Sequence, residues 1–243
     1  MSLYAVGDIH GQYDELMKIM DAMSPTSEDT VVFLGDYIDR GPKSPEVLEQ
    51  LIKWKQEFPH WQFLFGNHEQ LFLDYHMQNG LRFGQYCWLQ NGGDVTRDSY
   101  KPAQLSDYEK AIFQFEMPKE HVDFIVGLDL WYETEDYFFV HGGIIPEEPI
   151  DASKDYPDTM LWARDGFINS DWNWGKKIIF GHTPAYRKEW GKIGYPIVKE
   201  NKIGLDGAVC PPGNHALLAA NLTDNTCYRV QTNSLKLQTF DIY

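Results

Sequence analysis

Cysteine is scarce in this chain. Three of its 243 residues are cysteines, Cys87, Cys210 and Cys227, and no two of them form a Cys-x-x-Cys pair. This count excludes a disulfide framework and a cysteine-bound structural zinc, and it is typical of a reducing compartment. The chain also lacks an apolar run of 18 residues and a basic, apolar leader at Met1, so we expect neither a membrane span nor secretion. The sequence therefore predicts a cytoplasmic protein.

Basic residues are few as well. The 21 lysines and arginines stand against 36 aspartates and glutamates, which gives a formal net charge of −15. An acidic exterior repels nucleic acid and anionic membranes at long range. We therefore expect neither as a partner. The sequence does not give the oligomeric state, and a monomer is favoured.

Linker-like segments and internal repeats are also missing. No stretch rich in Pro, Gly or Ser divides the chain, and 43% of its residues are hydrophobic. A chain of this length can bury a substantial core and often folds as one α/β unit. We expect a single domain over residues 1–243.

What the chain does have is a set of short apolar runs, each followed at once by polar residues. The runs cover residues 3–6, 31–34, 63–65, 138–140 and 178–180. Continuous runs rich in Val, Ile and Phe are typical of strands buried on both faces. The polar residues that follow them should therefore lie at strand ends.

Helical patterns separate the first three runs. Apolar residues recur at helical spacing from Tyr13 to Met20, and Ser44 and Pro45 are a candidate N-cap and first residue of a second helix. A strand, helix, strand unit has a right-handed crossover, so its strands are parallel and their carboxyl ends share one edge. Residues far apart in the sequence can then meet in one pocket.

Six polar residues at these strand ends are metal ligands by type. They offer carboxylate oxygen, amide oxygen and imidazole nitrogen but no thiolate: Asp8, His10, Asp36, Asn67, His141 and His182. Such donors suit Mn²⁺, Fe²⁺ or Zn²⁺. The set is typical of a hydrolase that cleaves phosphate esters with two metal ions.

Six motifs carry a family resemblance. They are GDIHG at 7–11, GDYIDRG at 35–41, GNHE at 66–69, FVHGG at 139–143, LWAR at 161–164 and FGHTP at 180–184. In this order they are similar to the phosphoprotein phosphatase family of metallophosphoesterases, especially its bacterial and phage members, which are related to symmetrical diadenosine tetraphosphatases. The resemblance implies a calcineurin-like domain: an α/β four-layer sandwich of two mixed β-sheets packed face to face with helices outside.

The resemblance also implies a role for each ligand. Asp8 and His10 would bind a first ion, Asp36 would bridge, and Asn67, His141 and His182 would complete a second site. Two divalent ions are implied, with Mn²⁺ favoured over Fe²⁺ or Zn²⁺. A hydroxide bridging the ions would attack phosphorus directly, without a covalent phosphoenzyme.

Four further residues match catalytic positions of the family. Arg40 and Arg164 would clamp the phosphate, because a guanidinium can grip two oxygens at once. His68 would be the general acid, and Asp39 would orient its imidazole. The alternatives are structural: Arg40 could pair with a neighbouring aspartate on the surface, and Arg164 could pair with an acid at a helix start.

Two regions depart from the simple alternation. Between about 78 and 126, residues 81–89 and 108–113 predict helices separated by a stop at 91–93, so we expect a helical insert that either selects substrates or serves as a structural cap. Residues 202–206, 216–222 and 227–232 predict strands separated by turns at 211–214 and 223–225. We expect them to build a second sheet packed on the first.

The sequence therefore predicts a metal-dependent phosphomonoesterase. Its substrate would be a phosphoprotein, as for a serine/threonine phosphatase, or a small phosphoester such as an aryl phosphate. One alternative is symmetrical hydrolysis of diadenosine tetraphosphate, for which Tyr86, Trp88, Tyr100 or Trp190 could supply stacking aromatics. A non-catalytic binding module is the other alternative, although every expected position of the site is filled.

Overall fold

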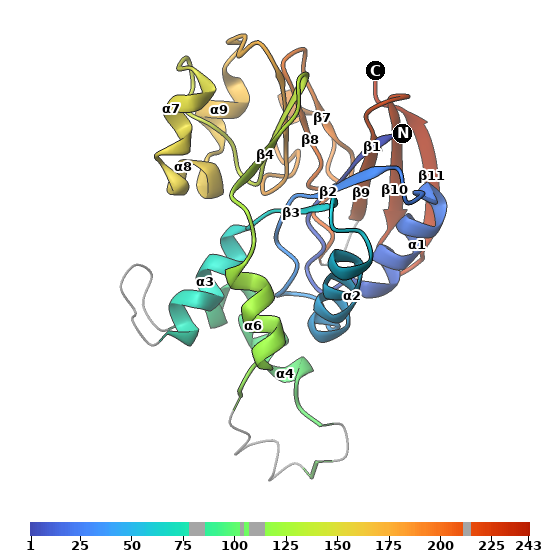
Figure 1. Cartoon of the computed structure of the whole chain (residues 1–243), viewed down its shortest axis with the longest axis vertical. Helices are drawn as coiled ribbons and strands as arrows, with labels where there is room; N and C mark the ends of the chain where they lie inside the picture. Colours follow the sequence, from blue (N-terminus) through green and yellow to red (C-terminus); the bar gives the residue numbers. More distant parts are fainter. Residues whose placement is uncertain (78–85, 103–104, 107–114, 211–214) are drawn as a thin grey trace.

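The computed structural model describes residues 1–77, 86–102, 105–106, 115–210 and 215–243 (Figure 1). The first third of the chain alternates strands and helices as predicted. Its elements are β1 (Leu3–Val6), α1 (Tyr13–Met23), β2 (Thr30–Phe33), α2 (Ser44–Glu57), β3 (Gln62–Phe63) and α3 (Asn67–His76).

The remaining elements follow in three groups. Short helical segments come first: η1 (Leu89–Gly93), α4 (Asp94–Ser99) and α6 (Lys119–Val126). A strand and helix group follows: β4 (Trp131–Glu133), β5 (Tyr137–Val140), α7 (Ile150–Lys154), α8 (Pro157–Trp162), α9 (Asp165–Asn169) and β6 (Lys177–Phe180). The last group is η2 (Lys188–Trp190), β7 (Ile197–Val198), β8 (Lys202–Gly204), β9 (Ala216–Asn221), β10 (Thr226–Gln231) and β11 (Lys236–Asp241).

The strands form two mixed sheets. The first sheet has the order β11-β10-β9-β1-β2-β3, and the second has the order β4-β5-β6-β8-β7. Strands β1, β2 and β3 pair in parallel, as do β5, β6 and β8. A second sheet was expected from residues 202–206, 216–222 and 227–232. The first of these segments does contribute to it, as β8, but the other two were predicted wrongly, because β9 and β10 extend the first sheet. Strand β9 is buried along its whole length and pairs antiparallel with β1.

Alternating side chains show how the layers stack. Ala5 and Val32 of the first sheet share one buried cluster with Phe139 and Ile179 of the second, so the sheets pack face to face. The neighbouring residues of the same strands point outward: those of the first sheet under α1 and α2, and those of the second under α7, α8 and α9. Figure 1 shows these helix groups on opposite outer sides. The predicted four-layer sandwich is therefore confirmed.

The predicted N-cap of the second helix is wrong. Helix α2 begins at Ser44 itself, with Pro45 in its first turn and no side-chain cap. The Ser44 hydroxyl is buried and lies 3.0 Å from the Thr96 hydroxyl. The side chain is therefore used to join α2 to α4.

The insert is described only in part. The predicted helix at 108–113 and the turn at 211–214 lie outside the described residues, and so does most of the helix at 81–89. At the predicted stop, Gly92 has a φ of 101°, and the next helix, α4, begins two residues later at Asp94.

In the part of the chain that the structure describes, no helix is both long and apolar enough to cross a bilayer.

Candidate metal centre

All ten predicted site residues lie at one edge of the sandwich. Asp8 and His10 follow β1; Asp36, Asp39 and Arg40 follow β2; and Asn67 and His68 begin α3. His141 and His182 follow the parallel strands β5 and β6 of the other sheet, and Arg164 immediately precedes α9. The carboxyl ends of parallel strands share one edge, so these loops converge.

Two hydrogen bonds join the loops across the sheets. His141 Nδ1 donates to the carbonyl oxygen of Leu34 at 2.8 Å, and the backbone N–H of His182 donates to the Asp8 carboxylate at 3.0 Å. Each bond connects the end of a strand in one sheet to the other sheet. The relative position of the two halves of the site is therefore fixed by the fold.

Five of the ten residues have a left-handed backbone. Their φ angles are 46° for His10, 54° for Asp36, 74° for Asp39, 67° for Arg40 and 63° for His182. A non-glycine residue in this region costs free energy and persists only where its surroundings impose the conformation. Such residues gather at functional sites, and here they hold ligand side chains in place.

Two groups of potential ligands share Asp36. His10, Asp36 and His68 have donor atoms within 4.8 Å of one another, and so do Asp36, His141 and His182. Asp36 Oδ2 lies 3.6 Å from His10 Nε2, and Asp36 Oδ1 lies 3.2 Å from His141 Nε2. The two oxygens of one carboxylate thus face different groups. A carboxylate placed in this way can bridge two ions.

Asn67 completes the second group. Its Oδ1 accepts hydrogen bonds from His141 Nε2 at 2.9 Å and from His182 Nδ1 at 2.7 Å. The other ring nitrogen of His182 is buried and has no hydrogen-bond partner among the described residues. Burying a polar atom without a partner costs free energy. Because the unpartnered nitrogen of His182 lies in a cluster of oxygen and nitrogen atoms of the kinds that bind metals, the cluster is suited to a cation.

Burial and neighbouring charges set the protonation of the ligands. Burial lowers the pKa of both His10 and His182 well below the ordinary value, and neighbouring cationic groups lower it further. Burial alone would raise the pKa of Asp36, but His141 and His68 outweigh it and lower that pKa well below the usual range. Neutral imidazoles and an ionised carboxylate are the forms that bind metal.

His68 and Asp39 form a buried pair. His68 Nδ1 donates to Asp39 Oδ2 at 2.7 Å. The same carboxylate accepts hydrogen bonds from Trp88 Nε1 at 2.9 Å and from the Thr96 hydroxyl at 2.8 Å. Trp88 and Thr96 both belong to the insert between 78 and 126. The described part of the insert therefore fixes the carboxylate that orients His68, a role that the sequence did not reveal.

The two arginines lie at the exposed side of the site. Arg40 donates from Nη1 to His10 Nε2 and from Nη2 to His68 Nε2, both at 2.8 Å. Arg164 donates to the His182 carbonyl oxygen and to the Thr183 hydroxyl, both at 3.3 Å. An arginine can only donate, so His68 Nε2 is an acceptor here and its proton is on Nδ1.

Glu69 is the last residue of the GNHE motif, and the sequence alone predicts no role for it. Its buried carboxylate accepts four backbone N–H groups, those of Asp36, Tyr37, Ile38 and Gly66, at 2.8–3.3 Å. A Cβ on Gly66 would lie 2.3 Å from Asp36 Oδ1, so only glycine fits there. Glu69 therefore shapes the loop that presents Asp36.

Asp8 is the predicted ligand whose placement differs most from expectation. It belongs to neither ligand group, although it contacts His182 through the backbone. Burial raises its pKa well above the ordinary value, and the nearby carboxylate of Asp206 raises it further. Asp206 itself is buried and follows β8 at the same edge. The position of Asp206 directly after the apolar residues of a predicted strand is the sequence signal that could have identified it as a further residue of this site.

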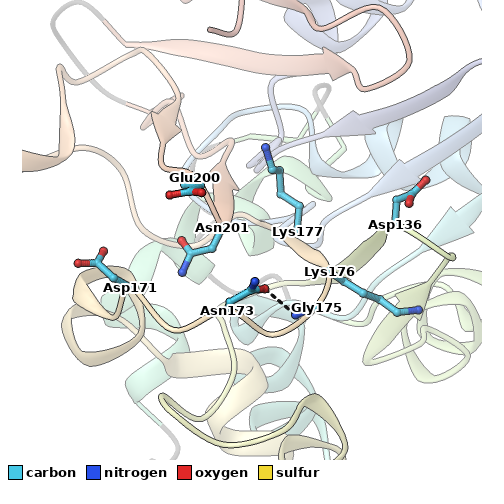
Figure 2. A pocket seen from close by; sticks show the side chains of 8 residues that line it. All are labelled: Asp136, Asp171, Asn173, Gly175, Lys176, Lys177, Glu200 and Asn201. Carbon is cyan, nitrogen blue, oxygen red and sulfur yellow. Dashed lines mark hydrogen bonds between the residues drawn. The ribbon is translucent and has the colours of Figure 1, made fainter.

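A separate hollow of about 370 Å³ lies at the opposite end of the second sheet (Figure 2). Its lining includes Asp136 before β5, Lys176 and Lys177 at the start of β6, and Glu200 before β8. None of the ten predicted site residues lines it. Lys176 already pairs with Glu133, and Lys177 donates to the Tyr243 hydroxyl.

Known proteins match this chain in sequence. A family described as calcineurin-like phosphoesterase matches residues 1–210. The serine/threonine-protein phosphatase PP2A-like PPG1 of Candida albicans is 45% identical over 65 residues. That segment is 26% of this chain and 16% of the relative, so the match spans far less than two thirds of the relative's length.

Solved structures share the fold. A chain proposed to be a diadenosine tetraphosphatase superposes with a TM-score of 0.63 at 17% identity, over 100% of this chain and 94% of that one. The cold-active protein-tyrosine phosphatase of a psychrophilic Shewanella species superposes with a TM-score of 0.55 at 21% identity, over 98% and 80%. At these identities the likeness establishes the fold alone.

Proposed function

We propose, from the premise that this chain belongs to the calcineurin-like phosphoesterase family, that it is a phosphomonoesterase using two divalent metal ions. Its main substrates would be phosphoserine and phosphothreonine in proteins, with small phosphoesters also accepted. The supporting observation is that the two carboxylate oxygens of Asp36 face His10 on one side and His141 on the other, beside the buried His68–Asp39 pair. We place the activity in the cytoplasm and in a monomer.

The ligand side chains have complementary parts in this proposal. His10 with Asp36 would hold one ion, joined by Asp8, and Asn67, His141 and His182 would hold the other. Bound divalent ions, most simply Mn²⁺, would supply Lewis acidity and an activated water. The chain's own residues must then bind the phosphoryl group and protonate the leaving oxygen.

Arg40 links these two tasks. Its guanidinium donates to His68 Nε2 in the structure, so that nitrogen cannot donate a proton at the same time. Phosphoryl oxygens would draw Arg40 away and, with Arg164, would hold it by charge-assisted hydrogen bonds. His68 Nε2, once free of Arg40, would take up a proton from solvent and pass it to the leaving alkoxide, while Asp39 keeps the ring oriented.

A substrate panel tests the proposal. Metal-stripped protein would be restored with Mn²⁺, Fe²⁺, Zn²⁺ or Mg²⁺, and kcat/KM compared for phosphoserine, phosphothreonine and phosphotyrosine peptides, diadenosine tetraphosphate and 4-nitrophenyl phosphate. We expect Mn²⁺ to restore turnover of the phosphomonoesters, with the phosphoserine and phosphothreonine peptides preferred. A higher kcat/KM for diadenosine tetraphosphate would favour that hydrolase. Folded, Mn²⁺-loaded protein without any turnover would favour a binding module.

A further inference from the structure

The loop after His182 places a tyrosine at the rim of the site. Tyr186 is four residues beyond His182, so its Cα lies within about 14 Å of the Cα of that histidine. The loop leaves from the carboxyl end of β6, the edge at which the ligands gather. The Tyr186 side chain is 47% exposed. An exposed aromatic residue thus has its Cα within about 14 Å of the Cα of a proposed metal ligand.

The ring of Tyr186 is fixed in place. It packs edge-on against Trp190, with ring centroids 4.9 Å apart and planes at 71°. Trp190 is buried, and its Nε1 donates to Asn169 Oδ1 at 2.8 Å at the end of α9. The Tyr186 hydroxyl donates to Asp165 Oδ1 at 2.9 Å at the start of α9. Both ends of one helix therefore hold this segment.

The same helix ties the tyrosine to the phosphate-binding side of the site. Asp165 directly follows Arg164. Arg164 in turn donates to the carbonyl oxygen of His182 and to the hydroxyl of Thr183. Tyr186 is thus linked to a proposed metal ligand through the chain and to a proposed phosphate clamp through Asp165.

The polar atoms around the ring are already used. Asp165 accepts the Tyr186 hydroxyl and also pairs with Arg187, which lies 4.0 Å from Glu189 as well. The Arg187 guanidinium carbon lies 5.8 Å from the centre of the Tyr186 ring. What remains for a ligand is ring surface, which favours contact with a flat aromatic group over recognition by hydrogen bonds.

The aromatic residues that the sequence suggested for stacking are less suitable. Trp88 and Trp190 are buried in the core, and Tyr100 is partly buried against His121 and Phe115. Tyr86 is exposed, but no ring contact fixes it among the described residues. Tyr186 combines exposure, a fixed ring and two connections to the site.

We propose that Tyr186 is a specificity-determining residue that stacks on a planar aromatic group carried by the ester being hydrolysed. The group is the ring of a phosphorylated aromatic alcohol or the base of a nucleotide, since both present the same flat face. The inference rests on the proposed phosphomonoesterase function and adds which of the small phosphoesters the site would favour, namely those that carry a flat aromatic group.

Matched substrates isolate the stacking. Benzyl phosphate and cyclohexylmethyl phosphate have similar size and are both esters of primary alcohols, but only the first has a flat ring. Adenosine 5′-monophosphate and ribose 5-phosphate differ only in the base. We would measure kcat/KM for all four with the Mn²⁺-loaded wild-type protein and the variants Tyr186→Ala, Tyr186→Phe and Tyr156→Ala. Tyr156 is a matched exposed tyrosine with no part in the proposal.

We expect Tyr186→Ala to lower kcat/KM for the aromatic member of a pair about three- to tenfold more than for its partner. Tyr186→Phe should keep the wild-type ratio because it keeps the ring, and Tyr156→Ala should change nothing. An effect on the benzyl pair alone assigns the subsite to aryl groups, and an effect on the nucleotide pair alone assigns it to a base. Equal losses within both pairs, or no loss, would overturn the inference. Wild-type protein inactive on all four esters and on the phosphoserine and phosphothreonine peptides would instead refute the proposed function.

Discussion

His68 is the residue whose replacement separates proton donation from the rest of the site. Its Nδ1 is held by Asp39 and its Nε2 faces the exposed Arg40. We expect His68→Asn to lower kcat about 100-fold or more for alkyl esters, because their leaving oxygen needs a proton. The loss should be only a few-fold for 4-nitrophenyl phosphate, whose leaving group is stable as an anion.

The matched control for this variant is His76→Asn. His76 is an exposed histidine at the end of the same helix, α3. Its replacement should leave both kinds of substrate unaffected. A loss in His68→Asn that is the same for every leaving group would show that His68 is not the acid.

His141 gives a prediction about pH. Burial lowers its pKa, but the charge of Asp36 outweighs burial and raises the pKa to about 9. Both ring nitrogens face acceptors, at Leu34 and at Asn67 and Asp36, as expected for an imidazolium. A metal ion bound at Nε2 must displace that proton. Below about pH 9, Mn²⁺ affinity should therefore rise about tenfold per pH unit.

Calorimetric titration in buffers of different ionisation enthalpy would count the protons released. We expect this group to release about one proton per protein molecule at pH 7, on binding of the one ion that His141 would hold. His10 and His182 should add none, because burial keeps both neutral there. Affinity that stays constant between about pH 6.5 and 8.5 would contradict the assignment.

The sequence indicated which residues meet, but it did not reveal what holds them. Each predicted ligand directly follows or shortly follows an apolar run, and parallel pairing brings such positions together without further information. Glu69, Trp88 and Thr96 act through contacts with backbone or side chains from other segments, and no local pattern marks such contacts. The roles of the ten residues remain predictions, and the position of Asp8 outside both ligand groups is the point that most needs measurement.

At the scale of elements, buried strands were the predictable part. The five apolar runs appear as β1, β2, β3, β5 and β6, with ends shifted by at most two residues. Strands β4, β7 and β11 were missed because they are short or partly exposed and have no continuous apolar run. The partner of β9 could not be predicted either. A strand buried on both faces fits the middle of either sheet.

The insert between 78 and 126 gives an element-scale prediction. Its Trp88 ring fills the core while Nε1 donates to Asp39, so Trp88→Phe removes the donor and keeps an aromatic ring. Losing one hydrogen bond to the buried Asp39 carboxylate, which orients His68, should cost about 1–2 kcal/mol. If this cost appears in the activation free energy, kcat falls about tenfold. The loss should be largest for esters with poor leaving groups, as for His68→Asn.

Trp61→Phe is the matched control for this prediction. Trp61 is also buried and donates through Nε1, but to the Asp29 carbonyl oxygen. Both variants should lower the free energy of unfolding by a similar amount, measured by denaturant titration, and only Trp88→Phe should lower kcat. Equal kcat in the two variants would mean that the insert is a structural cap.

At the scale of the whole molecule, the net charge of the protein has the same sign as the charge of the proposed substrate. The chain carries a formal charge of −15, yet the proposed substrate is an anion. Arg40 and Arg164 are exposed at the site and act over a short range, whereas the acidic exterior acts over the Debye length. The surface should therefore attract peptides whose phosphorylated residue is flanked by Lys or Arg.

Salt dependence separates this long-range field from contacts within the site. At an ionic strength of about 0.01 M, where the Debye length is about 30 Å, we expect kcat/KM to be several-fold higher for a phosphoserine peptide with flanking lysines than for one with flanking glutamates. At about 1 M, where the Debye length is about 3 Å, the two values should converge. Glycerol 2-phosphate, which has no flanking charges, reports the effect of salt on the chemical step. Equal turnover of the two peptides at low salt would show that the acidic exterior does not select substrates. A difference that persists at about 1 M, where the surface charges are screened, would have to come from direct contacts.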